Sequence, residues 1–377
     1  MAKSYDVVII GGGMSGIILA ITLKKAGIST CIVEAKDRIG KKILASGNGK
    51  CNILNTNLDI SNYNNSFPAF ALEKYNYNEL SKFYNSLGLL LKADDEGRVY
   101  PYSESSNTVL NIFLEEINKL NIPVFENEKV TSISEINDKF SIKSSNSEYI
   151  SRVLVLASGS NATTGYNSHV LLAPFSHHIT KTSQSLVPIK AEALKGANGV
   201  RSKAYASLYI NNNKVFGERG ELLFKDNAIS GILAFKMSAH IAREIVKGKS
   251  FDSYIEIDFV PDYSEEELNL ILENTNITGI LHKAIANNFK ESKNIAHDIK
   301  HYKCKVLGLM GLDNAQVTSG GLDTKEFDNT TMQSKIVKNL YAIGEVLDVD
   351  GQCGGYNLAF AAASALICRD SIIKDLC

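Results

Sequence analysis

The sequence lacks an excess of charge of either sign. It contains 40 lysine and arginine residues against 41 aspartate and glutamate residues, so the formal net charge at pH 7 is −1. Proteins that bind nucleic acids usually present a strongly basic surface to the phosphate backbone. We therefore do not expect a nucleic acid as the partner of this chain.

Long hydrophobic runs and paired cysteines are missing as well. No apolar run approaches the length of about 18 residues that spans a membrane. Near the N-terminus, the apolar residues 7–10 lead directly into glycines, so no signal-peptide core is present. The six cysteines are scattered without a CxxC pair. This pattern predicts free thiols, no membrane association and a cytoplasmic location.

What the sequence does contain is a glycine turn between two apolar segments. Residues 6–10 (DVVII) predict a strand, 11–16 (GGGMSG) a turn that begins a helix, and 30–34 (TCIVE) a second strand. Gly11 allows the tight turn, Gly13 lets the backbone approach a pyrophosphate, and Gly16 lets the helix pack against the sheet. The helix N-terminus then offers N–H groups to the phosphates. This order predicts a site for an adenine dinucleotide.

The acid that ends the second strand narrows the choice of dinucleotide. Glu34 lies where a carboxylate accepts hydrogen bonds from a ribose diol, and a 2′-phosphate there would meet like charge. The pattern therefore disfavours NADP at this site. FAD and NAD remain open on these residues alone.

Two further glycine-rich regions favour FAD. Residues 40–52 (GKKILASGNGKCN) follow the second strand and suit the far end of a long cofactor. Near the C-terminus, a strand over 340–343 ends in Gly344 and Glu345, and a helix begins near Asn357. A helix N-terminus stabilises the negative charge of a reduced flavin, a charge that a nicotinamide ring does not carry. A site closed by the first and last segments therefore suits FAD better than NAD.

The rest of the chain alternates expected helices and strands, and its pattern changes after about residue 190. Residues 70–91, 107–120 and 228–246 are expected to be helical, and 98–102, 123–125, 129–133, 139–143 and 149–156 extended. Residues 203–225 alternate polar and apolar side chains, as antiparallel hairpins do, with a turn at Asn211–Asn213. A strand over 251–259 and helices over 264–305 complete this part. The length of 377 residues allows about two or three domains.

The motifs together resemble a family of bacterial flavoproteins. GGGMSG (11–16), GKKILASGNGKCNILN (40–55), GRVYPYSE (97–104), SLVPI (185–189), TSGGLDTKEFD (318–328), TMQSK (331–335) and GEVLDVDGQCGGYNLAFAAASA (344–365) span nearly the whole chain. They are similar to the aminoacetone-oxidase-like family, which includes bile-acid 3-oxo-Δ4,6 reductases, within the glutathione-reductase-like two-dinucleotide-binding flavoproteins. One departure is Ala157-Ser158-Gly159-Ser160, where such families usually read Ala-Thr-Gly-Gly.

The resemblance implies an α/β fold with three parts. These are a split Rossmann-like FAD-binding domain (1–190 and 330–377), an inserted β-barrel domain (191–260 and 306–329) and a small helical subdomain (261–305). The implied FAD-binding residues are Gly11, Gly13, Met14, Ser15, Gly16, Glu34, Ala35, Lys36, Lys42, Ser46, Gly47, Asn48, Gly49, Cys51, Asn52, Val130, Ala157, Gly159, Gly344, Glu345, Gly355, Asn357 and Leu358.

No catalytic side chain stands out, because flavin chemistry belongs mostly to the cofactor. Tyr100 and Tyr356 are candidate proton donors, and Arg98 a candidate anchor for an anionic substrate; packing roles and a surface salt bridge are the alternatives. Cys51 and Cys353 lie in the flavin-side loops, where two free thiols are favoured over a redox pair. His297 and His301 have the spacing of zinc ligands on a helix, but the glutamate of HExxH is absent. We expect no metal.

The expected function is that of an FAD-dependent oxidoreductase. Hydride would pass between flavin N5 and a small organic substrate, with NAD(P)H as a possible transient reductant or O2 as the oxidant. Two alternatives stay open, namely an NAD-dependent dehydrogenase and a flavoprotein that modifies RNA or only binds flavin. These residues make no prediction of the oligomeric state.

Overall fold

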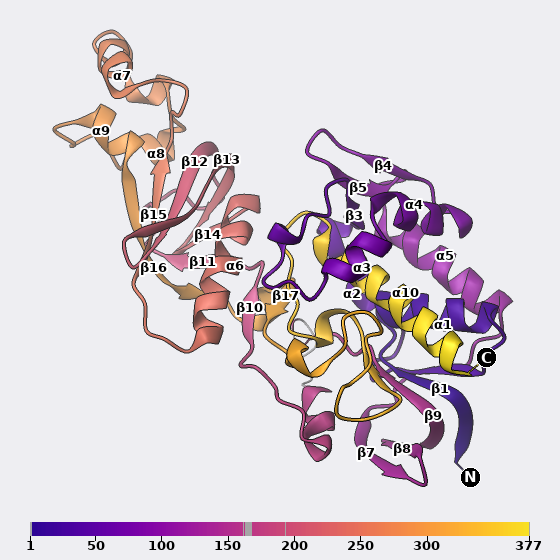
Figure 1. Ribbon diagram of the computed structural model, residues 1–377. Coiled ribbons are helices and arrows are strands. Elements are labelled where there is room, and N and C mark those ends of the chain that lie inside the picture. Colours follow the sequence, from indigo (N-terminus) through magenta and orange to yellow (C-terminus); the bar gives the residue numbers. More distant parts are fainter. Residues whose placement is uncertain (1, 161, 163–167, 193, 377) are drawn as a thin grey trace. The chain divides into compact units, whose positions relative to one another are not determined.

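The chain divides into two compact units. The computed structural model describes residues 2–160, 162, 168–192 and 194–376. One unit consists of Met1–Thr182 and Gly320–Cys377, and the other of Ser183–Ser319. Figure 1 shows that the first unit contains both ends of the chain, so the indigo and yellow segments belong together. The domain limits expected from the sequence, at 190 and 330, stay predictions.

The first unit is built on a mainly parallel sheet in the order β6-β2-β1-β9-β8-β7, with β18 also paired to β9. The pairs between β6, β2, β1, β9 and β18 are parallel, whereas β8 and β7 extend the sheet as an antiparallel hairpin. The strands are β1 (Lys3–Ile10), β2 (Thr30–Val33), β6 (Val124–Phe125), β7 (Val130–Ile136), β8 (Lys139–Ser144), β9 (Glu148–Leu156) and β18 (Leu340–Ala342).

Helices cover this sheet, and the first of them is buried on all sides. In α1 (Met14–Lys25), every residue from Met14 to Leu23 is buried. The reason is that α1 contacts α10 (Tyr356–Leu376) and α5 (Ser106–Lys119) as well as β2. Figure 1 shows α10, in yellow, beside α1. The C-terminal helix thus completes the core that the N-terminal strands begin.

The remaining elements of the first unit are short. A small sheet has the order β3-β5-β4. Its strands and the accompanying helices are β3 (Leu54–Asn55), β4 (Leu91–Ala93), β5 (Arg98–Pro101), α2 (Lys41–Ala45), α3 (Ala69–Lys74) and α4 (Tyr77–Ser86).

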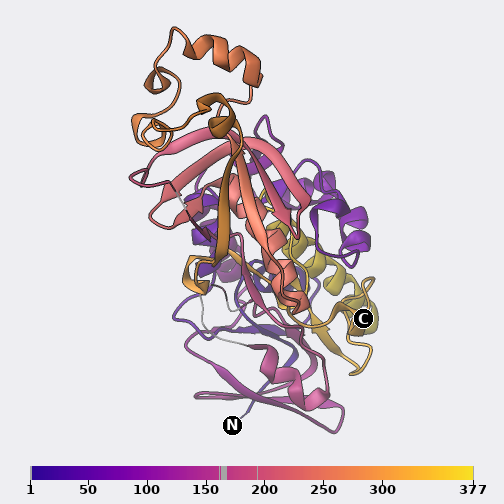
Figure 2. The ribbon, with the colours of Figure 1, turned by 90° about the vertical axis from the view of Figure 1, so that its left-hand side faces the viewer.

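The second unit is a closed antiparallel barrel in the order β11-β14-β13-β12-β15-β16. Figure 2 shows its strands with the helical segment beyond one end. A separate two-stranded ladder joins β10 to β17. The elements are β10 (Ser183–Ser185), β11 (Ile189–Ala191), β12 (Arg201–Ile210), β13 (Asn213–Lys225), β14 (Ala228–Ser230), α6 (Ile232–Lys247), β15 (Ser253–Asp258), α7 (Glu265–Leu272), α8 (Lys283–Ala286), α9 (Ile295–Lys300), β16 (Tyr302–Leu309) and β17 (Val317–Ser319).

Local chemistry explains several barrel features that the sequence predicts. Alternate residues of β12 (Ala204, Ala206, Leu208) are buried, as expected for a strand with one face in a core. Asn211 and Asn212 form the β12–β13 hairpin loop with φ values of 50° and 64°. Asparagine tolerates this left-handed conformation better than most residues, so the predicted turn is confirmed.

The predicted α/β fold with an inserted barrel is confirmed, but three element predictions are wrong in detail. The helix expected over 70–91 is two helices that end at Ser86, followed by β4. The helix expected from 228 begins at Ile232, because residues 228–230 pair with β11 and β13 as β14. The helices expected up to 305 end at Lys300, where β16 closes the barrel. Short strands in closed sheets are decided by tertiary pairing, which periodicity does not capture.

Among the helices of the described residues, none combines the length and apolar character of a membrane span.

The parallel register gives a test of the core. Ile9 is fully buried in β1 between Ile32 of β2 and Val155 of β9. We expect Ile9→Ala to lower the free energy of unfolding by about 2–5 kcal/mol, because it removes buried methylenes and leaves a cavity. Ile136→Ala, at a position of β7 that is 57% exposed, is the control. Equal urea-unfolding curves for the two variants would contradict this packing.

Candidate functional site

The glycine turn after β1 lies at the carboxyl end of the parallel strands, and two of its glycines are enclosed by protein. Gly11 has a φ of 108°, and a Cβ there would lie 2.5 Å from the carbonyl oxygen of Ala157. A Cβ on Gly16 would lie 2.1 Å from the carbonyl oxygen of Gly11. No side chain fits at either position. Gly11 therefore brings β1 against the end of β9, and Gly16 brings α1 against the turn.

Gly13 differs from its neighbours because space is open beside it. A Cβ on Gly13 would meet no atom within 4 Å. Gly13 is the N-cap of α1, and no side chain caps the helix. The N–H groups of the first helical turn, including those of Met14 and Ser15, lack intrahelical acceptors. An open cradle at an uncapped helix N-terminus is suited to an anionic group such as a pyrophosphate.

Glu34 is held rigidly beside this cradle. Its carboxylate accepts hydrogen bonds from the N–H of Gly12 (2.7 Å) and the N–H of Lys36 (2.8 Å). A carboxylate has about four acceptor positions, so two remain for the hydroxyls of a ribose. The carbonyl of Glu34 accepts from the N–H of Glu128 (2.9 Å), two positions before buried Val130, and the carbonyl of Lys36 accepts from the N–H of Asn127 (2.8 Å). Ala35 lies between these two acceptors. The predicted adenosine-side residues are thus brought together.

The loop over 40–52 has an unusual backbone. Gly47, Asn48, Gly49 and Cys51 all have positive φ values, of 55°, 53°, 83° and 56°. For asparagine and cysteine this conformation is strained and is maintained by surrounding contacts. Here the N–H of Cys51 donates to the carbonyl of Ser46 (3.1 Å), and the Cys51 side chain is buried. Strain of this kind is typical of loops that shape a binding site.

One ion pair joins this loop to the C-terminal segment. Lys42 Nζ lies 2.6 Å from Glu345 Oε2, and the Ser160 hydroxyl donates to Glu345 Oε1 (2.6 Å). Lys42 also donates to Ser160 (3.4 Å), and a Cβ on Gly159 would lie 4.0 Å from Lys42 Nζ. Residues that are far apart in the sequence therefore meet just past the end of β9.

Glycines of the C-terminal segment make further close approaches. A Cβ on Gly344 would lie 2.9 Å from the Ser15 hydroxyl, which places the end of β18 against the first turn of α1. The Gly344 N–H donates to the buried Ser364 hydroxyl of α10 (3.0 Å). A Cβ on Gly355 would lie 2.1 Å from the carbonyl oxygen of Leu54. Residues 11–16 and 40–55 thus pack against residues 344–358 from the other end of the chain, and we call these segments together the wall.

Hydrogen bonds from asparagine side chains hold the segments of the wall together. The Asn55 amide donates to the Gly354 carbonyl (2.9 Å). The Asn52 amide, oriented to satisfy its neighbours, accepts from the N–H of Gly355 (3.2 Å). Asn357 accepts from the N–H of Gly351 (2.8 Å) and donates to the Gly351 carbonyl (2.9 Å). Asn357 thus braces the loop before α10, and the next residue, Leu358, packs partly buried against the core.

The predicted site residues therefore all lie in the first unit, on the segments that follow β1, β2, β9 and β18, with Val130 as the first residue of β7. Sequence reasoning missed Ser160, Ser364 and Asn55 as parts of the site. Asn55 is the last residue of the motif over 40–55, so its position was signalled. Ser160 replaces the last glycine of the Ala-Thr-Gly-Gly pattern that is usual in the family. Only the fold shows that its hydroxyl bonds to Glu345.

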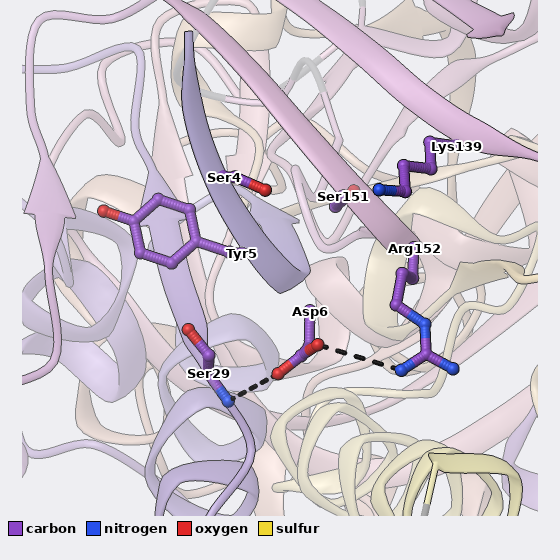
Figure 3. Close-up of a pocket in the computed structure, with 7 residues that line it drawn as sticks. All are labelled: Ser4, Tyr5, Asp6, Ser29, Lys139, Ser151 and Arg152. Atoms are coloured by element: carbon purple, nitrogen blue, oxygen red, sulfur yellow. Dashed lines mark hydrogen bonds and ion pairs between the residues drawn. The ribbon is translucent and has the colours of Figure 1, made fainter. Parts of the chain in front are cut away.

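A separate pocket lies away from this wall. It has a volume of about 310 Å³ and is lined by Ser4, Tyr5, Asp6, Ser29, Lys139, Ser151 and Arg152. Figure 3 shows Asp6 directed towards Arg152, at a distance of 3.9 Å, and bonded to the N–H of Ser29. These residues of β1 precede the buried half of the strand, whereas the glycine turn follows its end. The pocket is therefore not the dinucleotide cradle.

Two cysteines lie in the segments near the wall, and no disulfide joins Cys51 to Cys353. Burial raises the pKa of Cys51 to about 11, so this thiol stays protonated at neutral pH. Burial also raises the pKa of Tyr100, whereas the neighbouring Arg98 lowers it. Arg98 pairs with Asp94 (2.8 Å) and Glu96 (2.9 Å), the arrangement of a local ion pair.

Comparison with known proteins decides the family. Residues 5–371 match the family described as HI0933-like protein Rossmann domain. The chain belongs to this family. The resemblance inferred from the motifs is thereby confirmed, and the chain is an FAD-dependent oxidoreductase.

Several relatives match over their whole length. The chain is 31% identical over 399 residues to the 3-dehydro-bile acid delta(4,6)-reductase of Clostridium scindens, covering 95% of this chain and 97% of that protein. It is 27% identical over 420 residues to the ribosomal RNA dihydrouridine synthase of Haemophilus influenzae, covering 100% of both. The Escherichia coli protein of the same name is 24% identical, and the match covers 98% of each chain.

A solved structure shares the fold. The 3-ketosteroid-delta4-(5alpha)-dehydrogenase of Rhodococcus jostii superposes with a TM-score of 0.51 at 14% identity, covering 98% of this chain and 97% of that one. At this level of identity the similarity concerns the fold alone.

The open space beside Gly13 gives a direct test of the cradle. We expect Gly13→Val to lower the affinity for FAD at least about tenfold, because its methyl groups occupy the space where the pyrophosphate approaches. Thermal unfolding of the cofactor-free protein should change little, since no protein atom is displaced. The measurement is a fluorescence titration of cofactor-free protein with FAD.

The matched control is Gly311→Val. Gly311 also has open space around its Cβ position, and its φ of −62° is ordinary for any residue, but it lies in the barrel unit. Equal FAD affinity for the Gly13 variant and this control would refute the assignment of Gly13.

Proposed function

We propose that this oxidoreductase passes a hydride from flavin N5 to a small organic substrate, and that the bond reduced is a carbon–carbon double bond conjugated to a carbonyl group. The observation that carries the proposal is the cradle itself, in which both chain ends meet beside the uncapped N-terminus of α1. FAD fits there, with its pyrophosphate at Gly13 and its ribose at Glu34.

The relatives support the type of bond. The name of the Clostridium scindens relative states a 3-oxo bile acid with double bonds at positions 4 and 6. A uridine that becomes dihydrouridine is reduced at a double bond conjugated to a carbonyl in the same way. In both substrates the carbonyl makes the β-carbon electron-poor, so hydride adds there and a proton adds to the α-carbon. FAD, when bound, would supply the hydride, with NAD(P)H as the proposed reductant of the flavin.

The chain's own contribution to this reaction is the proton and the orientation of the substrate. Tyr100 of β5 is our candidate proton donor, because β5 pairs with β3, whose Asn55 bonds to Gly354 of the C-terminal segment. Burial raises the pKa of Tyr100, so its hydroxyl stays protonated at neutral pH. A neutral hydroxyl can donate its proton to the α-carbon as hydride arrives at the β-carbon, and solvent then restores the proton.

Uridine in RNA is the second candidate substrate. It is favoured by the two full-length matches to ribosomal RNA dihydrouridine synthases. We rank a small molecule as the first candidate substrate, because the chain has no net positive charge and its identity to the bile-acid reductase is higher.

Reoxidation of the reduced protein distinguishes these substrates. We expect the anaerobically reduced, FAD-loaded protein to regain its yellow colour on addition of a 3-oxo-Δ4,6 steroid, whose product gains two hydrogens by mass spectrometry. The saturated 3-oxo steroid is the control and should leave the flavin reduced. Reoxidation by uridine-containing ribosomal RNA alone would support the second candidate, whereas reoxidation by O2 alone would overturn the proposal.

Tyr100→Phe tests the proton donor. We expect the substrate-reduction step to slow by about 10²–10⁴-fold, the usual contribution of a positioned acid, while anaerobic flavin reduction by NAD(P)H is unchanged. Stopped-flow absorbance separates the two steps. The control is Tyr102→Phe, at an exposed position two residues further along. Equal rates for both variants would show that Tyr100 only packs.

A further inference from the structure

Two histidines of the helical segment share one face of α9. His297 lies within this helix and His301 directly follows its last residue, so the i, i+4 spacing brings their rings together. The ring centroids are 4.8 Å apart, and the ring planes are inclined by 35°. From the sequence alone no metal is expected here, because the pattern lacks the acid of HExxH.

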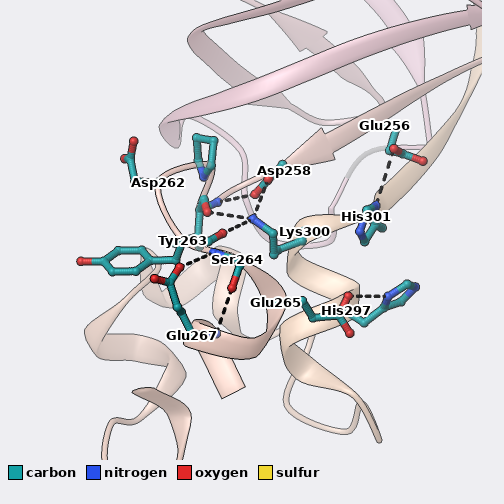
Figure 4. Close-up of polar contacts among 12 residues, drawn as sticks. Glu256, Asp258, Asp262, Tyr263, Ser264, Glu265, Glu267, His297, Lys300 and His301 are labelled. Carbon is teal, nitrogen blue, oxygen red and sulfur yellow. Dashed lines mark hydrogen bonds and ion pairs between the residues drawn. The ribbon is translucent and has the colours of Figure 1, made fainter. Parts of the chain in front are cut away.

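The fold supplies the missing acid from another helix. Glu265, the first residue of α7, places its Oε2 3.1 Å from Nδ1 of His297. Figure 4 shows Glu265 and both imidazoles gathered between the two helices. One ligand atom from each of the three side chains lies within 4.8 Å of the other two. Two histidines and one carboxylate form a ligand set that suits zinc.

The backbone around these side chains is well fixed. The Lys300 ammonium, which is 11% exposed, donates to Asp258 (2.8 Å) and to the carbonyls of Val260 (3.1 Å) and Tyr263 (2.6 Å). It thereby ties α9 to the segment that leads into α7. A capping box of Ser264 and Glu267 sets the first turn of α7, where Glu265 lies.

The side chains themselves can close around an ion. Zinc–ligand bonds of about 2.0–2.1 Å in a tetrahedron require ligand atoms about 3.3 Å apart. The side chains of Glu265, His297 and His301 are 32%, 52% and 44% exposed, so rotation of their side-chain torsions can shorten the present separations. No buried group has to move.

A second carboxylate stands behind the histidines. Glu256 of β15 places Oε1 3.6 Å from Nδ1 of His301, and it also pairs with Lys303 (3.3 Å). A carboxylate on one ring nitrogen orients the other nitrogen towards a metal and raises its basicity. With Lys300 engaged by Asp258, the charge that faces the cluster is mainly negative.

We propose that Glu265, His297 and His301 bind one zinc ion, with water completing its coordination, and that Glu256 positions His301. The ion joins α7 to α9. Within these two helices the buried apolar residues are Leu268 of α7 and Ala296 and Ile299 of α9. A metal bridge would therefore add a cross-link between two short helices that contribute few apolar side chains. The proposal is independent of the flavin chemistry.

The test titrates zinc into the full-length, FAD-loaded protein after removal of metals with a chelator. We expect calorimetry to show one zinc ion per chain, and substitution by cobalt to give the visible absorption of a tetrahedral site. Zinc should also slow hydrogen exchange of the amides in α7 and α9. His297→Gln and His301→Gln should each weaken binding more than about tenfold, and Glu256→Gln by about 10–100-fold.

His178→Gln is the matched control. His178 is an exposed histidine that pairs with one carboxylate, Asp323 (3.3 Å), in the other unit, so its loss should leave zinc affinity unchanged. No binding to the wild-type chain would overturn the proposal. Binding that survives both His297→Gln and His301→Gln would overturn it as well, because the zinc would then reside on other groups such as cysteine thiols.

Discussion

The parallel pairing of β2, β1, β9 and β18 is the constraint on which the rest of the site depends. Parallel strands bring their carboxyl ends to one edge of a sheet, and ligands of open α/β sheets bind at that edge. Here the glycine turn, Glu34, the segment over 157–160 and Glu345 each follow one of these strands. Residues from opposite ends of the chain therefore meet at one place.

Close backbone approaches then give this edge its shape. Gly11 against Ala157, Gly16 against Gly11 and Gly355 against Leu54 leave no room for a side chain. Gly13 alone in the dinucleotide turn has free space beside it. The glycines of the dinucleotide turn thus divide into those that pack protein against protein and one, Gly13, that leaves room for a ligand. Glycines of a single motif therefore have different physical roles.

Local patterns predicted those parts of the molecule in which short-range chemistry decides the structure. The strand–turn–helix of residues 6–34 and the Asn211–Asn212 hairpin both follow from residue type and spacing. Residues 228–230 form a strand only because β11 and β13 lie on either side. The bond of Ser160 to Glu345 and the approach of Glu265 to His297 depend on segments distant in sequence. Periodicity contains no information about such contacts.

We propose that FAD occupies the edge formed by both chain ends. The most direct measurement is the flavin content of the purified full-length chain. We predict a yellow protein that releases about one FAD per chain, chemically unchanged, when it is denatured, because the cradle binds the cofactor by hydrogen bonds and a helix N-terminus. A colourless protein that takes up no added FAD would contradict the account.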